Sequence, residues 1–129
     1  MAEARPASGV VSEREDLLDG RLRVELEGDA GGWSVAASFG WRRGREGAVA
    51  LDEGELTLIS GAGEAYASID AGSVTTDPDT GVTTVRARFT IDGSTGDWLR
   101  RGERISGDFS IHAREWSGEL RPGTASRTA

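Results

Sequence analysis

The feature that most constrains the fold of this chain is a two-residue alternation of apolar and polar side chains. Between Val85 and Ile91 every second residue is apolar, and the residues between them are arginine or threonine. The same pattern recurs over Leu22–Leu26, Trp33–Trp41 and Ile105–Ala113. Successive side chains of a strand point to opposite faces, so this period predicts β-strands that each bury one face.

Short turns separate the expected strands. Asp29–Gly32, Gly61–Gly63 and Asp77–Gly81 are rich in glycine and aspartate, which favour tight turns. Such connections suit hairpins, whereas a β-sandwich generally needs some longer crossings. The sequence therefore predicts an all-β fold, a small antiparallel up-and-down β-barrel of seven to eight strands, with a sandwich as the alternative.

The two ends of the chain lack this alternation. Ser12 is followed three residues later by Glu15, a spacing typical of a helix N-terminus, and Gly20 can end the turn. We therefore expect one domain in three parts. These are a flexible N-terminal segment with a short helix over residues 1–19, a β-barrel over residues 20–121, and a disordered tail over residues 122–129.

Composition excludes several kinds of chemistry. The chain has no cysteine or lysine and one histidine, which excludes disulfides, Schiff-base lysines and multi-histidine metal sites within the chain. We expect neither a metal nor a cofactor. The net charge of −7 argues against binding to nucleic acid or to an anionic membrane. No apolar run approaches the length of a membrane span or of a secretory signal, so we expect a cytoplasmic protein.

No motif identifies a catalytic residue. The carboxylate pairs at Glu53 and Glu55 and at Asp77 and Asp79 flank turns, where solvated side chains are common. His112 falls on the polar face of its expected strand, which favours a surface position. The catalytic residues are therefore unknown at this stage.

Aromatic residues are the more informative set. Trp33, Phe39 and Trp41 share one inward face, and Phe89 and Phe109 join them from other strands. These side chains form either a plain packed core or the wall of a ligand chamber. The inward faces carry almost no ionisable groups, so such a chamber suits an apolar ligand, or a reaction that needs shape and desolvation rather than proton transfer.

Two further tryptophans, Trp98 and Trp116, lie at strand ends or turns, where a barrel opens. With Tyr66 they are expected to frame the mouth and orient the ligand. The residues expected to bind a substrate are Trp33, Phe39, Trp41, Leu58, Tyr66, Phe89, Trp98, Phe109 and Trp116.

The segment between Gly54 and Leu120 resembles the allene-oxide-cyclase-like and dirigent-like barrels. The residues that carry the resemblance are Gly54–Leu58, Arg88–Trp98 and Arg104–Phe109. In those families a strand ends in a Gly-x-Thr-Gly-x-aromatic turn, followed by a loop and a glycine-bearing strand. The match covers about half of the chain, and its motif is structural rather than catalytic.

The resemblance implies an eight-stranded antiparallel barrel that works without a cofactor as a homo-oligomer, with a dimer favoured. Bacterial relatives include natural-product cyclases, among them [4+2] cyclases that fold a linear polyene inside the barrel. It thus implies a cofactor-free cyclase or isomerase of polyketide biosynthesis, with residues 1–18 as a mobile cap. The acidic and tyrosine residues of a dirigent site have no counterpart here.

Two other functions stay open. A lipocalin-like barrel that binds an apolar small molecule without changing it needs the same lumen, so only turnover separates it from the cyclase. A barrel filled by its own side chains would act through its surface or as a subunit.

Overall fold

The computed structural model describes residues 4–17, 20–42 and 48–123, and the fold is a closed β-barrel. Its strands are β1 (Arg5–Asp16), β2 (Arg21–Ala30), β3 (Trp33–Arg42), β4 (Val49–Ser60), β5 (Gly63–Thr76), β6 (Thr83–Ser94), β7 (Arg104–His112) and β8 (Glu115–Pro122).

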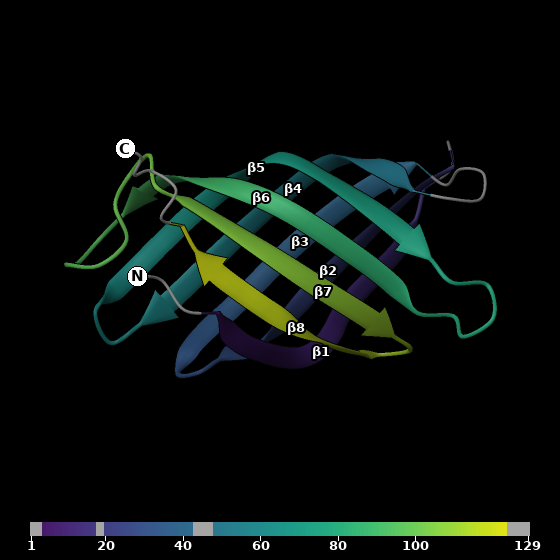
Figure 1. The fold of residues 1–129 in the computed structure, drawn as a ribbon, viewed down its shortest axis with the longest axis horizontal. Helices are drawn as coiled ribbons and strands as arrows, with labels where there is room; N and C mark the ends of the chain where they lie inside the picture. The colour runs from purple at the N-terminus through teal and green to yellow at the C-terminus, as the bar shows by residue number, and fades with distance from the viewer. Residues whose placement is uncertain (1–3, 18–19, 43–47, 124–129) are drawn as a thin grey trace.

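Each strand pairs antiparallel with the next one along the chain, and β8 pairs with β1 to close the barrel (Figure 1). The final hairpin is tight, because His112 pairs with Glu115 and only two residues lie between them. The predicted all-β up-and-down barrel is therefore confirmed, and the sandwich alternative is not what the chain forms. The described residues contain no helix long and apolar enough to cross a membrane.

The predicted N-terminal helix is wrong. Residues 5–16 form β1, and the Ser12 hydroxyl donates to the Glu25 carbonyl at 3.2 Å on the neighbouring strand instead of capping a helix. A register shift between Val11 and Glu13 interrupts the alternation of apolar and polar side chains. The sequence pattern therefore does not indicate this strand. Tertiary pairing overrides the local helix signal because β1 supplies the backbone partners of both β2 and β8.

The barrel consequently runs over residues 5–122 rather than 20–121. At the other end of the chain, Pro122 belongs to β8, and residues 124–129 of the expected tail lie outside the described residues.

Inward side chains fill the middle of the barrel. The rings of Phe39 and Phe109 have centroids 5.1 Å apart, Phe39 and Phe89 lie 6.1 Å apart, and Phe109 and Trp116 lie 5.5 Å apart. All three phenylalanines are completely buried. No polar or charged residue is buried among the residues that the structure describes. Apolar burial and ring packing therefore stabilise the barrel from within.

A pair of glycines lets β1 and β2 approach each other closely. Gly9 pairs with Gly28, and an ideal Cβ at Gly28 would lie 2.0 Å from the Ser8 carbonyl oxygen. Beside this pair, the Trp116 indole donates its Nε1–H to the Glu27 carbonyl at 3.1 Å. The glycines thus leave room for a contact between backbones that a larger residue would push apart.

We expect Phe109→Ala to lower the free energy of unfolding by about 3–5 kcal/mol, because it removes a ring packed between Phe39 and Trp116. Chemical denaturation measures this change. Val10→Ala, at a side chain that is 52% exposed, is the control and should change stability by less than about 0.5 kcal/mol. A loss at Phe109 no larger than the control's would contradict a filled core.

We expect Gly28→Ala to destabilise the barrel by about 1–3 kcal/mol, because the new methyl group meets backbone atoms that cannot move aside independently. Gly93→Ala is the matched control, since nothing lies within 4 Å of its ideal Cβ. Thermal unfolding of both variants compares them. Equal melting temperatures would show that the β1–β2 contact tolerates a side chain.

Candidate ligand site at one end of the barrel

The structure divides the predicted site residues among three places. Six of them lie in the core, two lie half-buried at one end of the barrel, and Tyr66 is exposed on the outer surface. The core residues are Phe39, Trp41, Leu58, Phe89, Phe109 and Trp116. The two at the end are Trp33 and Trp98, which pack against the edge of that core.

The centre of the barrel offers no space that these core residues enclose. Four hollows lined by described residues have volumes of about 490 to 610 Å³, and the three phenylalanines line none of them. These hollows lie on the outer face of the sheet or at a barrel end. The predicted inward set is thus placed together, but as packing around a filled centre.

One hollow, of about 520 Å³, brings the two half-buried tryptophans together. It lies where β1 and β3 begin and β8 ends, beside the loop that joins β6 to β7, and we call it the end hollow. Its lining residues are Ala4, Arg5, Pro6, Gly31, Trp33, Trp98, Leu99 and Pro122. Pro6, Trp33, Trp98, Leu99 and Pro122 give the wall an apolar part, and Arg5 gives it a charged part.

The tryptophans meet edge to face. Their ring centroids are 5.1 Å apart and their planes are inclined by 85°, a favoured geometry for aromatic pairs. The Trp98 indole N–H donates to the Thr95 carbonyl at 3.1 Å, which fixes the ring relative to its own loop. Trp33 follows the turn at Gly31 and Gly32, both of which have positive φ angles. Two indole surfaces are thereby held at the end of the barrel.

Arg5 places a positive charge against this pair. The carbon of its guanidinium lies 3.9 Å from the centroid of the Trp33 ring, a cation–π contact. Its Nη1 atom donates to the Ala30 carbonyl at 3.2 Å and to the Gly31 carbonyl at 2.8 Å. These bonds tie β1 to the turn between β2 and β3. The Arg5 side chain thus places a positive charge beside the hollow.

The turn that carries the family resemblance holds Trp98 in place. An ideal Cβ at Gly96 would lie 1.6 Å from the Ala62 carbonyl oxygen, so this loop packs directly on the turn between β4 and β5. Thr95 completes the contact, because its amide donates to the Glu64 carbonyl at 2.8 Å and its hydroxyl accepts from the Glu64 amide at 3.1 Å. The motif acts by positioning a loop rather than by presenting a reactive group.

Sequence reasoning missed Arg5, Pro6, Leu99 and Pro122. The two N-terminal residues were missed because β1 was expected to be a flexible segment, and Pro122 because it was assigned to the tail. The prolines themselves were a usable signal, since proline is tolerated at edges and ends of strands. Among the described residues no group of three or more histidine, aspartate or glutamate side chains is arranged to hold a metal ion.

Tyr66 lies away from the end hollow. It is 45% exposed on the outer face of β5, and its hydroxyl donates to the Glu64 carboxylate two residues earlier. This hydrogen bond and the negative charge of Glu64 raise the pKa of the phenol above its ordinary value. The residue is therefore part of the outer surface rather than of a mouth.

No protein-family model, curated protein or solved structure matches the chain at a significant level. The resemblance noted from the sequence therefore stays a prediction.

We expect the phenol of Tyr66 to titrate above its ordinary pKa of 10.0, because ionisation would break its hydrogen bond and place two negative charges together. Tyr66 is the only tyrosine, so tyrosinate absorbance reports it alone. Glu64→Gln should move the midpoint down toward the ordinary value. Asp70→Asn, which neutralises another carboxylate of β5, should leave the midpoint in place. An unchanged midpoint in Glu64→Gln would refute the assigned cause.

Proposed function

We propose that this protein binds a small apolar molecule in the end hollow. The observation that supports the proposal most directly is the hollow itself, in which two half-buried tryptophans meet edge to face beside the guanidinium of Arg5. Its volume of about 520 Å³ falls within the range of small-molecule sites, which are typically apolar with a few placed polar groups.

The lining indicates the class of ligand. Indole faces favour flat or unsaturated hydrocarbon frameworks, and the Arg5 guanidinium favours a negatively charged group at one end. A ring-containing or polyene molecule that bears a carboxylate satisfies both preferences. This binding role corresponds to the lipocalin-like alternative, with the ligand at the end of the barrel rather than in its centre.

The cofactor-free cyclisation expected from the family resemblance stays a separate proposal. A polyene enclosed in the lumen would have to displace the buried rings of Phe39, Phe89 and Phe109, which contact one another. The end hollow needs no such displacement, and for that reason we place binding first. A cyclase or isomerase would use the same aromatic wall to fold its substrate, so a test for turnover belongs in the same experiment.

The test is a titration of intrinsic tryptophan fluorescence with polyene carboxylic acids, fatty acids and their uncharged esters. We expect saturable quenching by the acids, with weaker binding of the esters because they lack the partner of Arg5. Trp98→Ala should weaken binding at least about tenfold, equivalent to about 1.4 kcal/mol, since it removes one wall of the hollow.

Tyr66→Phe is the matched control, because it changes an exposed aromatic residue away from the hollow and should bind as the parent does. Mass spectrometry of the bound compounds then separates binding from catalysis. An unchanged ligand at one equivalent supports the binding function, and conversion beyond one equivalent supports the cyclase or isomerase. A folded Trp98→Ala protein that binds as tightly as the parent would overturn the assignment of this site.

A further inference from the structure

Charge is distributed unevenly around the barrel. Strands β1–β5 carry eleven carboxylates and five arginines, whereas strands β6–β8 carry four of each. Strands β1–β5 therefore form an acidic side, whereas on strands β6–β8 the charges of both signs balance. An uneven charge distribution of this kind orients approaching molecules.

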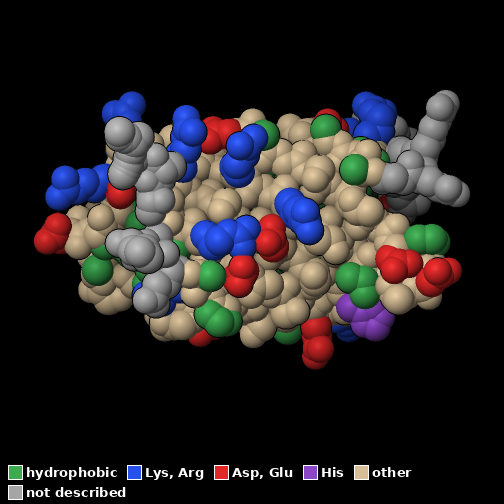
Figure 2. All heavy atoms as spheres, viewed as in Figure 1, with side chains coloured by type: hydrophobic (Ala, Val, Ile, Leu, Met, Phe, Trp, Pro, Cys, Tyr) green, Lys and Arg blue, Asp and Glu red, His purple; other side chains and the backbone are tan. Residues whose placement is uncertain are grey.

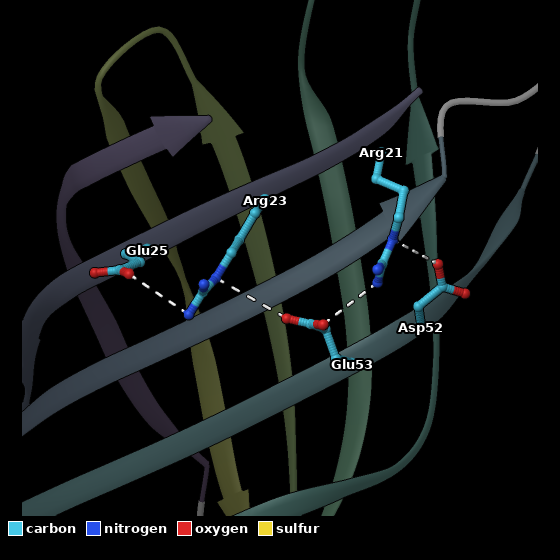
Figure 3. A network of polar contacts seen from close by, with 5 residues as sticks. All are labelled: Arg21, Arg23, Glu25, Asp52 and Glu53. Atoms are coloured by element: carbon cyan, nitrogen blue, oxygen red, sulfur yellow. Dashed lines mark hydrogen bonds and ion pairs between the residues drawn. The ribbon is translucent and has the colours of Figure 1, made fainter. Parts of the chain in front are cut away.

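Two arginines on the acidic side, Arg21 and Arg23, are already engaged by carboxylates. Arg21 contacts the carboxylates of Asp52 at 3.5 Å and Glu53 at 3.3 Å, and Arg23 contacts Glu53 at 3.9 Å and Glu25 at 3.7 Å (Figure 3). This network spans the outer faces of β2 and β4, and its cations are shared among carboxylates. It does not extend to Glu27 or Glu55, farther along the same strands, for which the described residues provide no ion-pair partner.

An exposed apolar groove lies beside these carboxylates. Across the outer face the register places Val10, Glu27, Ala36, Thr57 and Tyr66 in one row from β1 to β5. The small side chains of β3 form the floor, and the groove has a volume of about 560 Å³. Three large apolar residues are exposed on this face: Val10 is 52%, Ile59 45% and Tyr66 45% exposed. We call this surface the acidic groove. Val10 and Ile59 line it directly, and large exposed apolar residues on one face of a protein are typical of interaction sites.

The opposite side presents arginines over small residues. Arg86 and Arg88 point outward from β6, are exposed, and form no ion pair within the described residues. Arg121 of β8 lies on the same hollow and is held by Asp108 at 3.0 Å and by Glu119. The floor consists of Ala71, Ser73 and Ser106, and the volume is about 490 Å³. Figure 2 shows arginine side chains over the middle of this surface, which we call the arginine face.

We propose that the acidic groove of one copy binds the arginine face of a second copy. Arg86 and Arg88 lie two residues apart on one strand, so their charges repeat at about 7 Å on the arginine face. The carboxylates that they would meet are Glu27 and Glu55, for which the described residues provide no ion-pair partner. Two acidic grooves facing each other across a two-fold axis would instead oppose like charges, so the contact joins different surfaces.

The closed barrel restricts the contact to side chains. Every described strand has two hydrogen-bonded neighbours, so the described sheet has no edge strand, and only the end of β1, Glu13–Asp16, extends past β8. In this contact, burial of Val10, Ile59 and Tyr66 contributes the apolar interaction. Arg86 and Arg88 fix how the two copies align. Because the two surfaces differ, each added copy leaves one of each kind exposed, and the assembly grows as short chains rather than stopping at a dimer.

Sedimentation velocity over a range of protein concentrations tests this at about 20 mM and about 500 mM NaCl. We expect the weight-average sedimentation coefficient to rise with concentration at low salt and to fall toward the monomer value at high salt. Arg86→Glu with Arg88→Glu, and separately Glu27→Arg with Glu55→Arg, should each abolish association. An equimolar mixture of the two double variants should associate again, because each then offers a surface complementary to the other.

The apolar part of the contact is tested by one variant in the groove and one control outside it. Ile59→Ser should weaken association, whereas Leu17→Ser, at a residue 38% exposed outside the groove, should not. A parent protein that stays monomeric at every concentration and at both salt levels overturns the proposal. So does a salt-insensitive dimer that survives Arg86→Glu with Arg88→Glu, because that result would mean a two-fold interface. Failure of the mixed variants to associate overturns it as well.

Discussion

Closure of the sheet, by the pairing of β1 with β8, is the constraint on which the rest of the structure depends. A sheet that closes on itself leaves no unpaired strand edge, so every strand has hydrogen-bond partners on both sides. Closure also separates the two side-chain faces completely into interior and exterior. Closure places Pro122 in the end hollow, beside Arg5, which the pairing of β1 with β2 has set next to the turn before Trp33.

The packing inside this closed sheet decides where a ligand can bind. Three phenylalanines and Trp116 occupy the middle, where an open chamber would otherwise lie. The hollows that could hold a ligand therefore lie at the end of the barrel and on its outer face. The end hollow has an aromatic wall because Trp33 and Trp98 line it. Both side chains pack against the core and remain partly exposed. A rigid, filled barrel thus presents an aromatic site without needing an internal cavity.

The outer face has its own organisation, which follows from strand order. Acidic residues are frequent in the first five strands, and an up-and-down barrel keeps consecutive strands adjacent, so a bias along the sequence becomes a charged side of the molecule. Within that side, the network around Arg21 and Arg23 compensates only part of the negative charge. The small residues of β3 leave a groove between the taller side chains of its neighbours.

The sequence by itself determined most strands from β2 onward, their order and the inward position of Phe39, Phe89 and Phe109, because each strand carries its own two-residue alternation. The turn expected beside Glu53 and Glu55 is wrong, because β4 runs without a break over Val49–Ser60. Only the tertiary structure decided that residues 5–16 form a strand, since the local signal at Ser12 indicates a helix and its pairing with β2 and β8 outweighs that signal. The tertiary structure also decided that side chains fill the centre and that Arg5 contacts Trp33. Both features depend on contacts between residues distant in sequence, and a local pattern does not predict such contacts.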